Sequence, residues 1–441
     1  MRGGIGCQKP RCAHSSAPHK ILFPPLVRPA ILRSPDMPAK PTNHLSRREL
    51  FASTAALAAG ALALNERVLA ADTPGANVAD RTSTIKISAL KAMRVGTKAY
   101  IKIETNHQVT GWGEVTGLEP DIACVLARSL YELLDGENPT RIEHLWQKLY
   151  RSHRDIRGGS FMTHVISAID VALWDITGRL WGVPVYRLLG GPCRDKIRMY
   201  PSPKAHKTGT GGPHPFSGNP QDIERLVNNI RHSRQMVGPD GAVMFDAHCA
   251  VPPPMLIQLA AAIQPYDILW IEEPAVPGNI EVFKRLKQAI HIPLATGERD
   301  RTIWGMIPYL QERCIDILQP DCGHTGGISQ MKKIATLAEA YTVPLAPHCT
   351  CSELGLTASL HATAAIPNFL IHEGYLDGHL MPPGVAIRQW TVDKEGYATL
   401  PPGPGLGVDI DETMFDKVNA DPKRKYRWPL PKQPDGSVSD Y

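Results

Sequence analysis

The feature that most restricts the fold of this 441-residue chain is a periodic series of short apolar segments in its second half. Each segment ends in one polar side chain, and successive terminal residues lie 26, 26, 23, 27 and 25 positions apart. This spacing is that of a β-strand followed by a crossover helix, and helical patterns occupy intervals such as 280–290 and 328–341. Nearly continuous apolar strands are buried on both faces, which predicts a parallel α/β barrel of the TIM type with its active site at the carboxyl ends of the strands. The terminal residues are Asp246, Glu272, Glu298, Asp321, His348 and Glu373.

A differently organised region precedes this series. Residues 85–114 have the alternation of β-strands, and helical spacing of apolar residues follows between 138 and 180. Strands followed by helices predict a separate α+β domain. We expect this domain to span residues 84–195 and the barrel to span 196–380. Residues 381–441 are then a C-terminal segment that returns to the first domain.

The net charge of +5 comes from the first 71 residues. They contain ten Lys or Arg and three acids, so residues 1–71 carry +7 and the remainder is slightly acidic at −2. A nucleic-acid interface needs basic side chains clustered on a folded face. The charge distribution therefore predicts no nucleic-acid partner.

The basic leader, residues 1–71, has the pattern of an export signal. Ser46-Arg47-Arg48 opens an apolar run over 51–64, which resembles a twin-arginine signal. The run is shorter than a membrane-spanning helix, so we expect no membrane partner once the signal is removed. A periplasmic location follows, or a cytoplasmic one if the signal is not used; an N-terminal amphipathic or buried helix is the alternative. Met37, ten residues before the arginine pair, is the expected true start.

Carboxylates that converge on one barrel rim repel one another unless a cation lies between them. Oxygen atoms of Asp246, Glu272 and Glu298 suit a hard divalent ion such as Mg²⁺, which leaves positions for a substrate carboxylate or water. Neighbours in a strand point to opposite faces, which argues against the alternative of a zinc site with thiolate ligands. That alternative would use the cysteines next to the rim: Cys249, Cys322 and Cys349.

Histidines supply groups for proton transfer at the same rim. His348 follows Asp321 by one strand–helix unit, so a carboxylate on the adjacent strand can orient the imidazole as a base. His248 lies two residues beyond Asp246 and points to the same face. These groups predict that His348 abstracts the proton next to a carboxylate, that the metal stabilises the resulting enediolate, and that His248 protonates a departing hydroxyl.

Six short motifs carry a resemblance to a known family: Asp246-Ala247-His248, Glu272-Glu273-Pro274, Gly297-Glu298-Arg299, Gln319-Pro320-Asp321, Gly326-Gly327-Ile328 and Ala346-Pro347-His348. With them the chain resembles the enolase superfamily, mandelate racemase subgroup, from about residue 85 to the C-terminus. Within that subgroup it is similar to sugar-acid dehydratases of the galactonate and mannonate dehydratase type.

The resemblance implies an α+β capping domain followed by a modified (β/α)7β barrel. It implies Mg²⁺ as cofactor, a sugar acid as substrate and a 2-keto-3-deoxy sugar acid as product. Arg299 would either bind substrate oxygens or pair with a carboxylate, and Glu373 would lie near the substrate carboxylate. By the same resemblance, Asp246, Glu272 and Glu298 would bind the metal. Asp321 and His348 would form the base dyad, and His248 would be the acid that expels the 3-hydroxyl.

The sequence departs from the family pattern where a second barrel strand would lie. Residues 201–242 contain one clear helix, around 221–237, and no apolar run of strand length in their first part. We therefore expect the second strand to be lost or reduced to a loop, which either reaches the rim or is merely solvent-exposed. Side chains that could reach the rim from such a loop are Lys204, His206, Lys207 and His214.

The leading hypothesis is a Mg²⁺-dependent sugar-acid dehydratase that forms a homo-oligomer. A racemase or epimerase of an α-substituted acid is the first alternative, although a 1,1-proton transfer needs a base on each face of the α-carbon and the usual second-strand lysine is missing from the expected fold. The second alternative is an exported sugar-acid-binding protein without catalytic activity.

Overall fold

The computed structural model describes residues 84–210, 216–421, 423, 432, 433 and 435–438. The predicted twin-arginine leader and His214 lie outside these residues. Within the described part of the chain, no helix combines the length and apolar character needed to cross a membrane.

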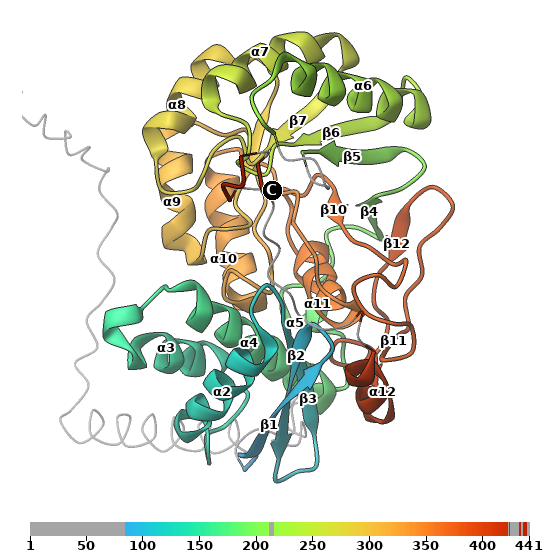
Figure 1. Ribbon diagram of the computed structural model, residues 1–441. Helices are drawn as coiled ribbons and strands as arrows, with labels where there is room; N and C mark the ends of the chain where they lie inside the picture. Colours follow the sequence, from blue (N-terminus) through green and yellow to red (C-terminus); the bar gives the residue numbers. More distant parts are fainter. Residues whose placement is uncertain (1–83, 211–215, 422, 424–431, 434, 439–441) are drawn as a thin grey trace, which may run out of the picture. The chain divides into compact units, whose positions relative to one another are not determined.

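The first domain is a three-stranded antiparallel sheet covered by helices (Figure 1). The long helix α4 (Ser160–Trp181) packs directly on β3. Gly111 and Gly113 permit this approach, because an added Cβ at these positions would lie 2.1 Å from Ala172 O and 1.9 Å from Ala168 O. The remaining elements of this domain are β1 (Ile87–Val95), β2 (Lys98–Thr105), β3 (Thr110–Val115), α2 (Pro120–Leu130), α3 (Ile142–Ser152) and α5 (Val185–Leu188).

The second domain is built from parallel strands that alternate with helices, as the periodic segments predict. The strands are β4 (Lys196–Tyr200), β5 (Ala205–Gly209), β6 (Ala242–Asp246), β7 (Ile268–Glu272), β8 (Leu294–Thr296), β9 (Ile317–Leu318) and β10 (His372–Glu373). The helices are α6 (Pro220–Val237), α7 (Pro253–Ile263), α8 (Ile280–Ala289), α9 (Thr302–Glu312), α10 (Gly327–Ala340) and α11 (Glu353–Ala364).

Parallel pairing runs around the barrel. Strands β5 to β9 form one sheet in chain order. Single parallel bridges continue it from Leu318 to Leu345 and from Leu345 to Phe369, and β10 then pairs with β4. Apolar side chains fill the barrel interior, where one buried cluster takes a residue from each of the eight parallel segments: Tyr200, Ala205, Met244, Trp270, Ala295, Ile317, Ala346 and Ile371.

The expectation that the second barrel strand is lost or reduced was wrong. β5 has five residues, the same number as β6 and β7, and it pairs in parallel with β6 from Ala205–Ala242 to Gly209–Asp246. The strand lacks an apolar run because Lys207 forms ion pairs and His206 binds the Ser233 hydroxyl, at 3.0 Å. Only the helix between the first two strands is missing, since four residues join β4 to β5.

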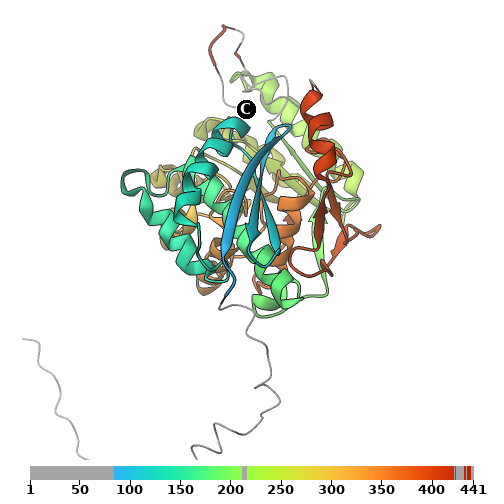
Figure 2. The ribbon, with the colours of Figure 1, turned by 90° about the horizontal axis from the view of Figure 1, so that it is seen from below.

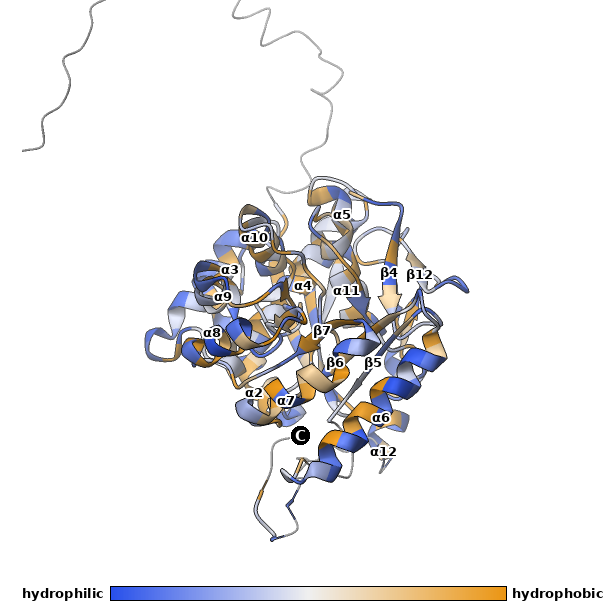
Figure 3. Cartoon of the chain, turned by 90° about the horizontal axis from the view of Figure 1, so that it is seen from above, coloured by the Kyte–Doolittle hydropathy of each residue, from blue (hydrophilic) through white to orange (hydrophobic). Residues whose placement is uncertain are grey.

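Amphipathic helices cover the outside of the barrel. In α6, for example, Leu226, Ile230 and Val237 are buried, while most of the remaining side chains are polar. Figure 3 shows this division as orange and blue sides of the helix. Such a pattern is expected for a helix that packs on a sheet with one face only.

The C-terminal segment contacts both domains. β12 (Tyr397–Thr399) pairs with β4, and β11 (Ala386–Arg388) pairs with β13 (Val408–Ile410). Helix α12 (Phe415–Ala420) then packs on the first sheet, where the Phe415 ring meets Tyr100 edge-on at 5.8 Å between centroids. Seen from below, this sheet lies between α2–α4 and α12 (Figure 2).

Candidate active site

Three predicted metal ligands lie at the ends of neighbouring strands. Asp246 is the last residue of β6 and pairs in register with Glu272, the last residue of β7. Glu298 follows β8 by two residues. Asp246 and Glu272 are 1% and 0% exposed, so their charges require partners. The Trp270 indole and the Gln319 amide donate to Glu272 Oε2 at 2.9 and 2.8 Å.

Lys207 of β5 joins these carboxylates. Its ammonium lies 3.0 Å from Asp246 Oδ2, 2.7 Å from Glu272 Oε1 and 2.9 Å from Glu373 Oε1. Burial alone would lower the pKa of Lys207, but Glu272, Glu373 and Asp246 hold it well above the usual value. The residue is therefore a buried cation that offsets part of the negative charge at the rim.

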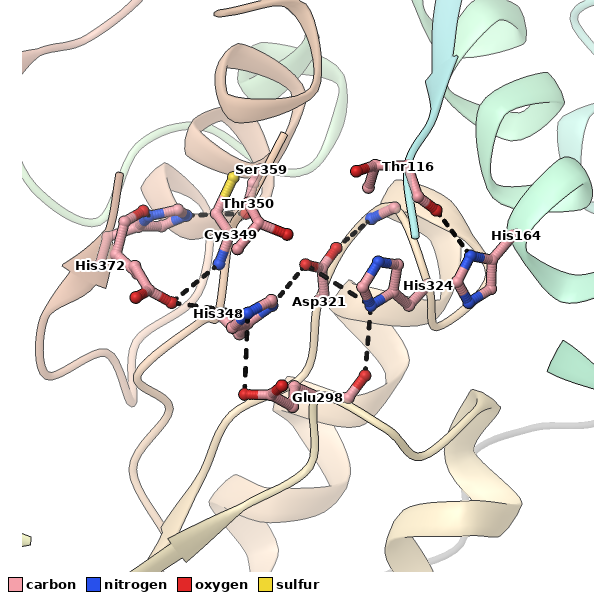
Figure 4. A network of polar contacts seen from close by, with 12 residues as sticks. Thr116, His164, Glu298, Asp321, His324, His348, Cys349, Thr350, Ser359 and His372 are labelled. Atoms are coloured by element: carbon pink, nitrogen blue, oxygen red, sulfur yellow. Dashed lines mark hydrogen bonds and ion pairs between the residues drawn. The ribbon is translucent and has the colours of Figure 1, made fainter. Parts of the chain in front are cut away.

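His348 and Asp321 form the expected pair on adjacent strands (Figure 4). The distance between His348 Nδ1 and Asp321 Oδ2 is 2.6 Å, and their backbones form a parallel bridge. Burial would raise the pKa of Asp321, but His324 and His348 lower it. With Nδ1 bound to Asp321, His348 Nε2 faces Glu298 Oε2 at 3.7 Å and Glu373 Oε2 at 3.8 Å.

Burial lowers the pKa of His348, but Glu298, the hydrogen bond to Asp321 and Glu373 together raise it well above the usual value. A base must be neutral before it accepts a proton. A divalent cation bound by Glu298 would offset the negative charge that raises the pKa of His348. The dyad and the metal ligands are thus electrostatically linked.

His248 lies two residues beyond the end of β6 and contacts the carboxylate of Asp246. Its backbone N–H donates to Asp246 Oδ1 at 3.0 Å, and its Nε2 lies 3.1 Å from Oδ2. The side chain is 33% exposed, so solvent reaches it. The structure therefore brings His248 to the carboxylate group, as expected from the spacing of two residues.

Glu373 and Arg299 have different surroundings. Glu373 binds Lys207 and also accepts hydrogen bonds from the Tyr375 hydroxyl, at 3.0 Å, and from the Cys349 N–H, at 3.3 Å. Arg299 grips Glu273 with two nitrogens, at 2.7 and 2.8 Å. Of the two expected roles of Arg299, substrate binding and pairing with a carboxylate, the structure shows the pairing.

Asp246, Glu272 and Glu298 have the donor chemistry that a divalent cation prefers. Burial raises the pKa of Glu298 well above its usual value, and the charges of Glu273, Glu272 and Asp246 raise it further, which is the repulsion that a cation relieves. The donors are all oxygen atoms, as Mg²⁺ prefers. Their oxygens do not form a compact group, however: among the described residues, only Asp321, His324 and His348 have three donor atoms that all lie within 4.8 Å of one another.

Two residues at this site are not evident from apolar patterning. Lys207 lies on β5 and not in a loop, and its side chain reaches the rim from one strand before Asp246. His324 lies three residues after Asp321, and its Nδ1 is 3.7 Å from Asp321 Oδ2. Of the other proposed loop residues, Lys204 is exposed and His206 faces α6.

Comparison with known proteins agrees with this architecture. Residues 198–414 match the enolase C-terminal domain-like family, and residues 76–190 match the N-terminal domain of mandelate racemase and muconate lactonizing enzyme. The D-galactonate dehydratase of Ralstonia pickettii (strain 12J) is 34% identical over 386 residues, which cover 81% of this chain and 100% of that protein. The chain belongs to the enolase superfamily.

Other members of the enolase superfamily give the same result. The D-galactonate dehydratase of Variovorax paradoxus (strain S110) is 33% identical, over 81% of this chain and 100% of its own. Among solved structures, an enolase from Agrobacterium radiobacter with Na and L-malate bound has a TM-score of 0.73 at 31% identity, over 81% of this chain and 100% of that one. The 3,6-anhydro-D-galactonate cycloisomerase of Zobellia galactanivorans has a TM-score of 0.69 at 29% identity, over 76% and 99%. The predicted capping domain and TIM-type barrel are thus confirmed.

Proposed function

We propose that this enolase-superfamily protein is a Mg²⁺-dependent dehydratase of a sugar acid, either an aldonate or an aldarate. The observation that carries the proposal is the orientation of His348: Asp321 binds its Nδ1 at 2.6 Å, and its Nε2 faces buried carboxylates at the barrel rim. The full-length relatives named D-galactonate dehydratase support a carbon–oxygen hydro-lyase.

The proposed reaction uses each of these side chains in a separate step. His348 Nε2 takes the proton from the carbon next to the substrate carboxylate, while Asp321 holds the imidazole in place. The electron pair of that C–H bond forms a C=C bond, the C–O bond at carbon 3 breaks, and His248 donates a proton so that the hydroxyl leaves as water. The resulting enol becomes the 2-keto-3-deoxy acid.

Mg²⁺ would be held by Asp246, Glu272 and Glu298. When bound, it would offset the charge of these carboxylates and polarise the substrate carboxylate, which makes the neighbouring proton more acidic. Lys207 and Tyr375 contact Glu373 and so fix the carboxylate next to His348.

Racemisation or epimerisation is a second candidate because of Lys207. Its Nζ and His348 Nε2 reach the two oxygens of the same Glu373 carboxylate, at 2.9 and 3.8 Å, from different strands. Two proton-transfer groups around one position are what a 1,1-proton transfer requires. This candidate predicts solvent deuterium in recovered substrate without loss of water.

The direct test is a screen of aldonic and aldaric acids with Mg²⁺, with detection of 2-keto-3-deoxy products. We expect at least one substrate, and we expect His348→Ala to abolish its turnover. His206→Asn is the matched control, because His206 lies on the barrel but binds Ser233. Absence of turnover with every acid would contradict the proposal. Ligand-induced thermal stabilisation that survives His348→Ala without product would instead support a binding protein.

We further propose export through the twin-arginine signal and a periplasmic location. The support is the Arg47-Arg48 pair followed by the short apolar run. Replacement of both arginines by lysine is expected to keep the unprocessed protein in the cytoplasm, as measured by cell fractionation. Equal processing of the variant and the parent would contradict this.

A further inference from the structure

A buried ion pair of the capping domain lies against the loop that follows His348. Lys98 of β2 and Glu114 of β3 are 5% and 3% exposed, with 3.7 Å between Lys98 Nζ and Glu114 Oε1. Lys98 Nζ also donates to Thr350 O and to Thr116 Oγ1, both at 2.6 Å. Side chains at the start of β2 and near the end of β3 thus contact residues that closely follow the proposed base.

Glu114 uses both carboxylate oxygens in this contact. Oε1 accepts the N–H of Ser352 at 2.8 Å, and Oε2 accepts the N–H of Gly355 at 3.2 Å and the Ser352 hydroxyl. These donors belong to the start of α11, where backbone N–H groups have no partner within the helix and an anion is favoured. A carboxylate held at both oxygens fixes position and orientation together.

The loop is therefore held from two sides. Cys349 N–H binds Glu373 at the rim, whereas Thr350 and Ser352 bind Lys98 and Glu114 of the capping domain. Four of the peptide groups between His348 and Gly355 are thus hydrogen-bonded to a charged side chain. The direction in which the His348 imidazole points depends on this backbone.

Asp321, the other residue of the dyad, is also linked to the end of β3 by a chain of contacts. The carbonyl of Thr116 accepts a hydrogen bond from His164 Nδ1 at 2.7 Å, and the His164 ring stacks on His324 at 4.3 Å between centroids and 12° between planes (Figure 4). His324 Nδ1 lies 3.7 Å from Asp321 Oδ2. The residues around β3 therefore flank both His348 and Asp321.

We propose that Glu114 is a positioning residue for the His348–Asp321 pair. Together with Lys98 it fixes the backbone of residues 349–355, and thereby the imidazole, from the capping domain. Proton transfer is sensitive to displacements of about 1 Å, so release of this backbone lowers the rate without removing a group that touches substrate. The proposal rests on the proposed function only in taking His348 as the base.

The test compares Glu114→Ala with Glu114→Gln, which keeps the shape and one acceptor oxygen. The matched control is Asp175→Asn, because Asp175 is another buried capping-domain carboxylate, which accepts hydrogen bonds from Trp112 and Leu406 backbone N–H groups at 3.1 and 2.8 Å. Three quantities are measured on the full chain: amide deuterium exchange in 349–355, the rate at which diethyl pyrocarbonate modifies His348, and kcat and KM.

Glu114→Ala is expected to accelerate exchange and modification and to lower kcat by about 10- to 100-fold, with KM changed less than about threefold. Glu114→Gln is expected to lie between Glu114→Ala and the parent, and Asp175→Asn to match the parent in all three. Unchanged exchange in 349–355, an equal rise in Asp175→Asn, or loop release with unchanged kcat would each overturn the proposal. If no sugar acid is turned over, the proposed function fails, while exchange and modification still decide whether Glu114 holds the loop.

Discussion

Asp170 predicts a specific pH dependence of stability. It lies on α4 and is 1% exposed; its Oδ2 accepts the N–H of Ser329 at 3.0 Å and its Oδ1 accepts the Ser329 hydroxyl at 2.5 Å. Burial raises the pKa of Asp170 from 3.8 to about 7, against the effect of the two Ser329 hydrogen bonds. The folded state therefore holds this proton at pH values where the unfolded chain has lost it.

The sign and size follow from linkage. Below about pH 4 the carboxyl group is protonated in both states and has no effect on stability. Between about pH 4 and 7 only the folded state holds the proton, so the free energy of unfolding falls as the pH rises. A shift of about three pKa units corresponds to about 4 kcal/mol of lost stability above pH 7. Between pH 5 and 8 the expected change is about 2.5 kcal/mol.

Asp170→Asn removes the titrating proton and keeps a similar shape. We expect the free energy of unfolding of the variant, relative to the parent, to rise by about 2.5 kcal/mol between pH 5 and pH 8. Urea unfolding of both proteins at each pH measures it, and the difference cancels the titration of the other groups. A difference that stays constant within about 0.5 kcal/mol, or that falls with pH, would refute the reasoning.

Three further predictions concern the rim. Lys207→Met leaves three carboxylates without their cation, so it is expected to destabilise the metal-free protein by about 3–5 kcal/mol and to increase the rise in melting temperature produced by Mg²⁺; a smaller rise than in the parent would contradict this. Chelation with EDTA is expected to abolish turnover and Mg²⁺ to restore it, and activity that persists in EDTA would exclude the proposed ligand set. His248→Asn is expected to lower dehydration by at least about 100-fold while His348 still exchanges the α-proton with D2O, detected by NMR; loss of both would assign His248 another role.

The rim could be predicted from sequence because strand ends in a parallel barrel share one edge. Asp246, Glu272, Asp321, His348 and Glu373 each close a short apolar segment, and their spacing alone places them together. The histidine–aspartate contact follows from adjacent strands. These are consequences of periodicity and do not require side-chain packing.

Strand β5 could not be predicted from the sequence, and the reason is physical. A buried strand is recognised by apolar residues, whereas the inward position of β5 is occupied by Lys207, whose charge is stabilised by carboxylates 39 to 166 positions away in the chain. Gly209 is equally uninformative in sequence, but an added Cβ there would lie 2.4 Å from Asp246 O. The contact of Glu114 with Ser352, which are 238 positions apart, likewise depends on how the two domains pack.

The return of the C-terminal segment has a consequence for synthesis of the protein. Tyr100 and Trp112 of the capping sheet pack against Phe415 at 5.8 and 6.4 Å between ring centroids. These partners lie more than 300 positions apart in the chain. The strands of the sheet are therefore synthesised first, and Phe415 can pack on them only after more than 300 further residues have been added. Nascent chains that have not yet reached residue 415 therefore lack the ring that packs edge-on against Tyr100 and Trp112.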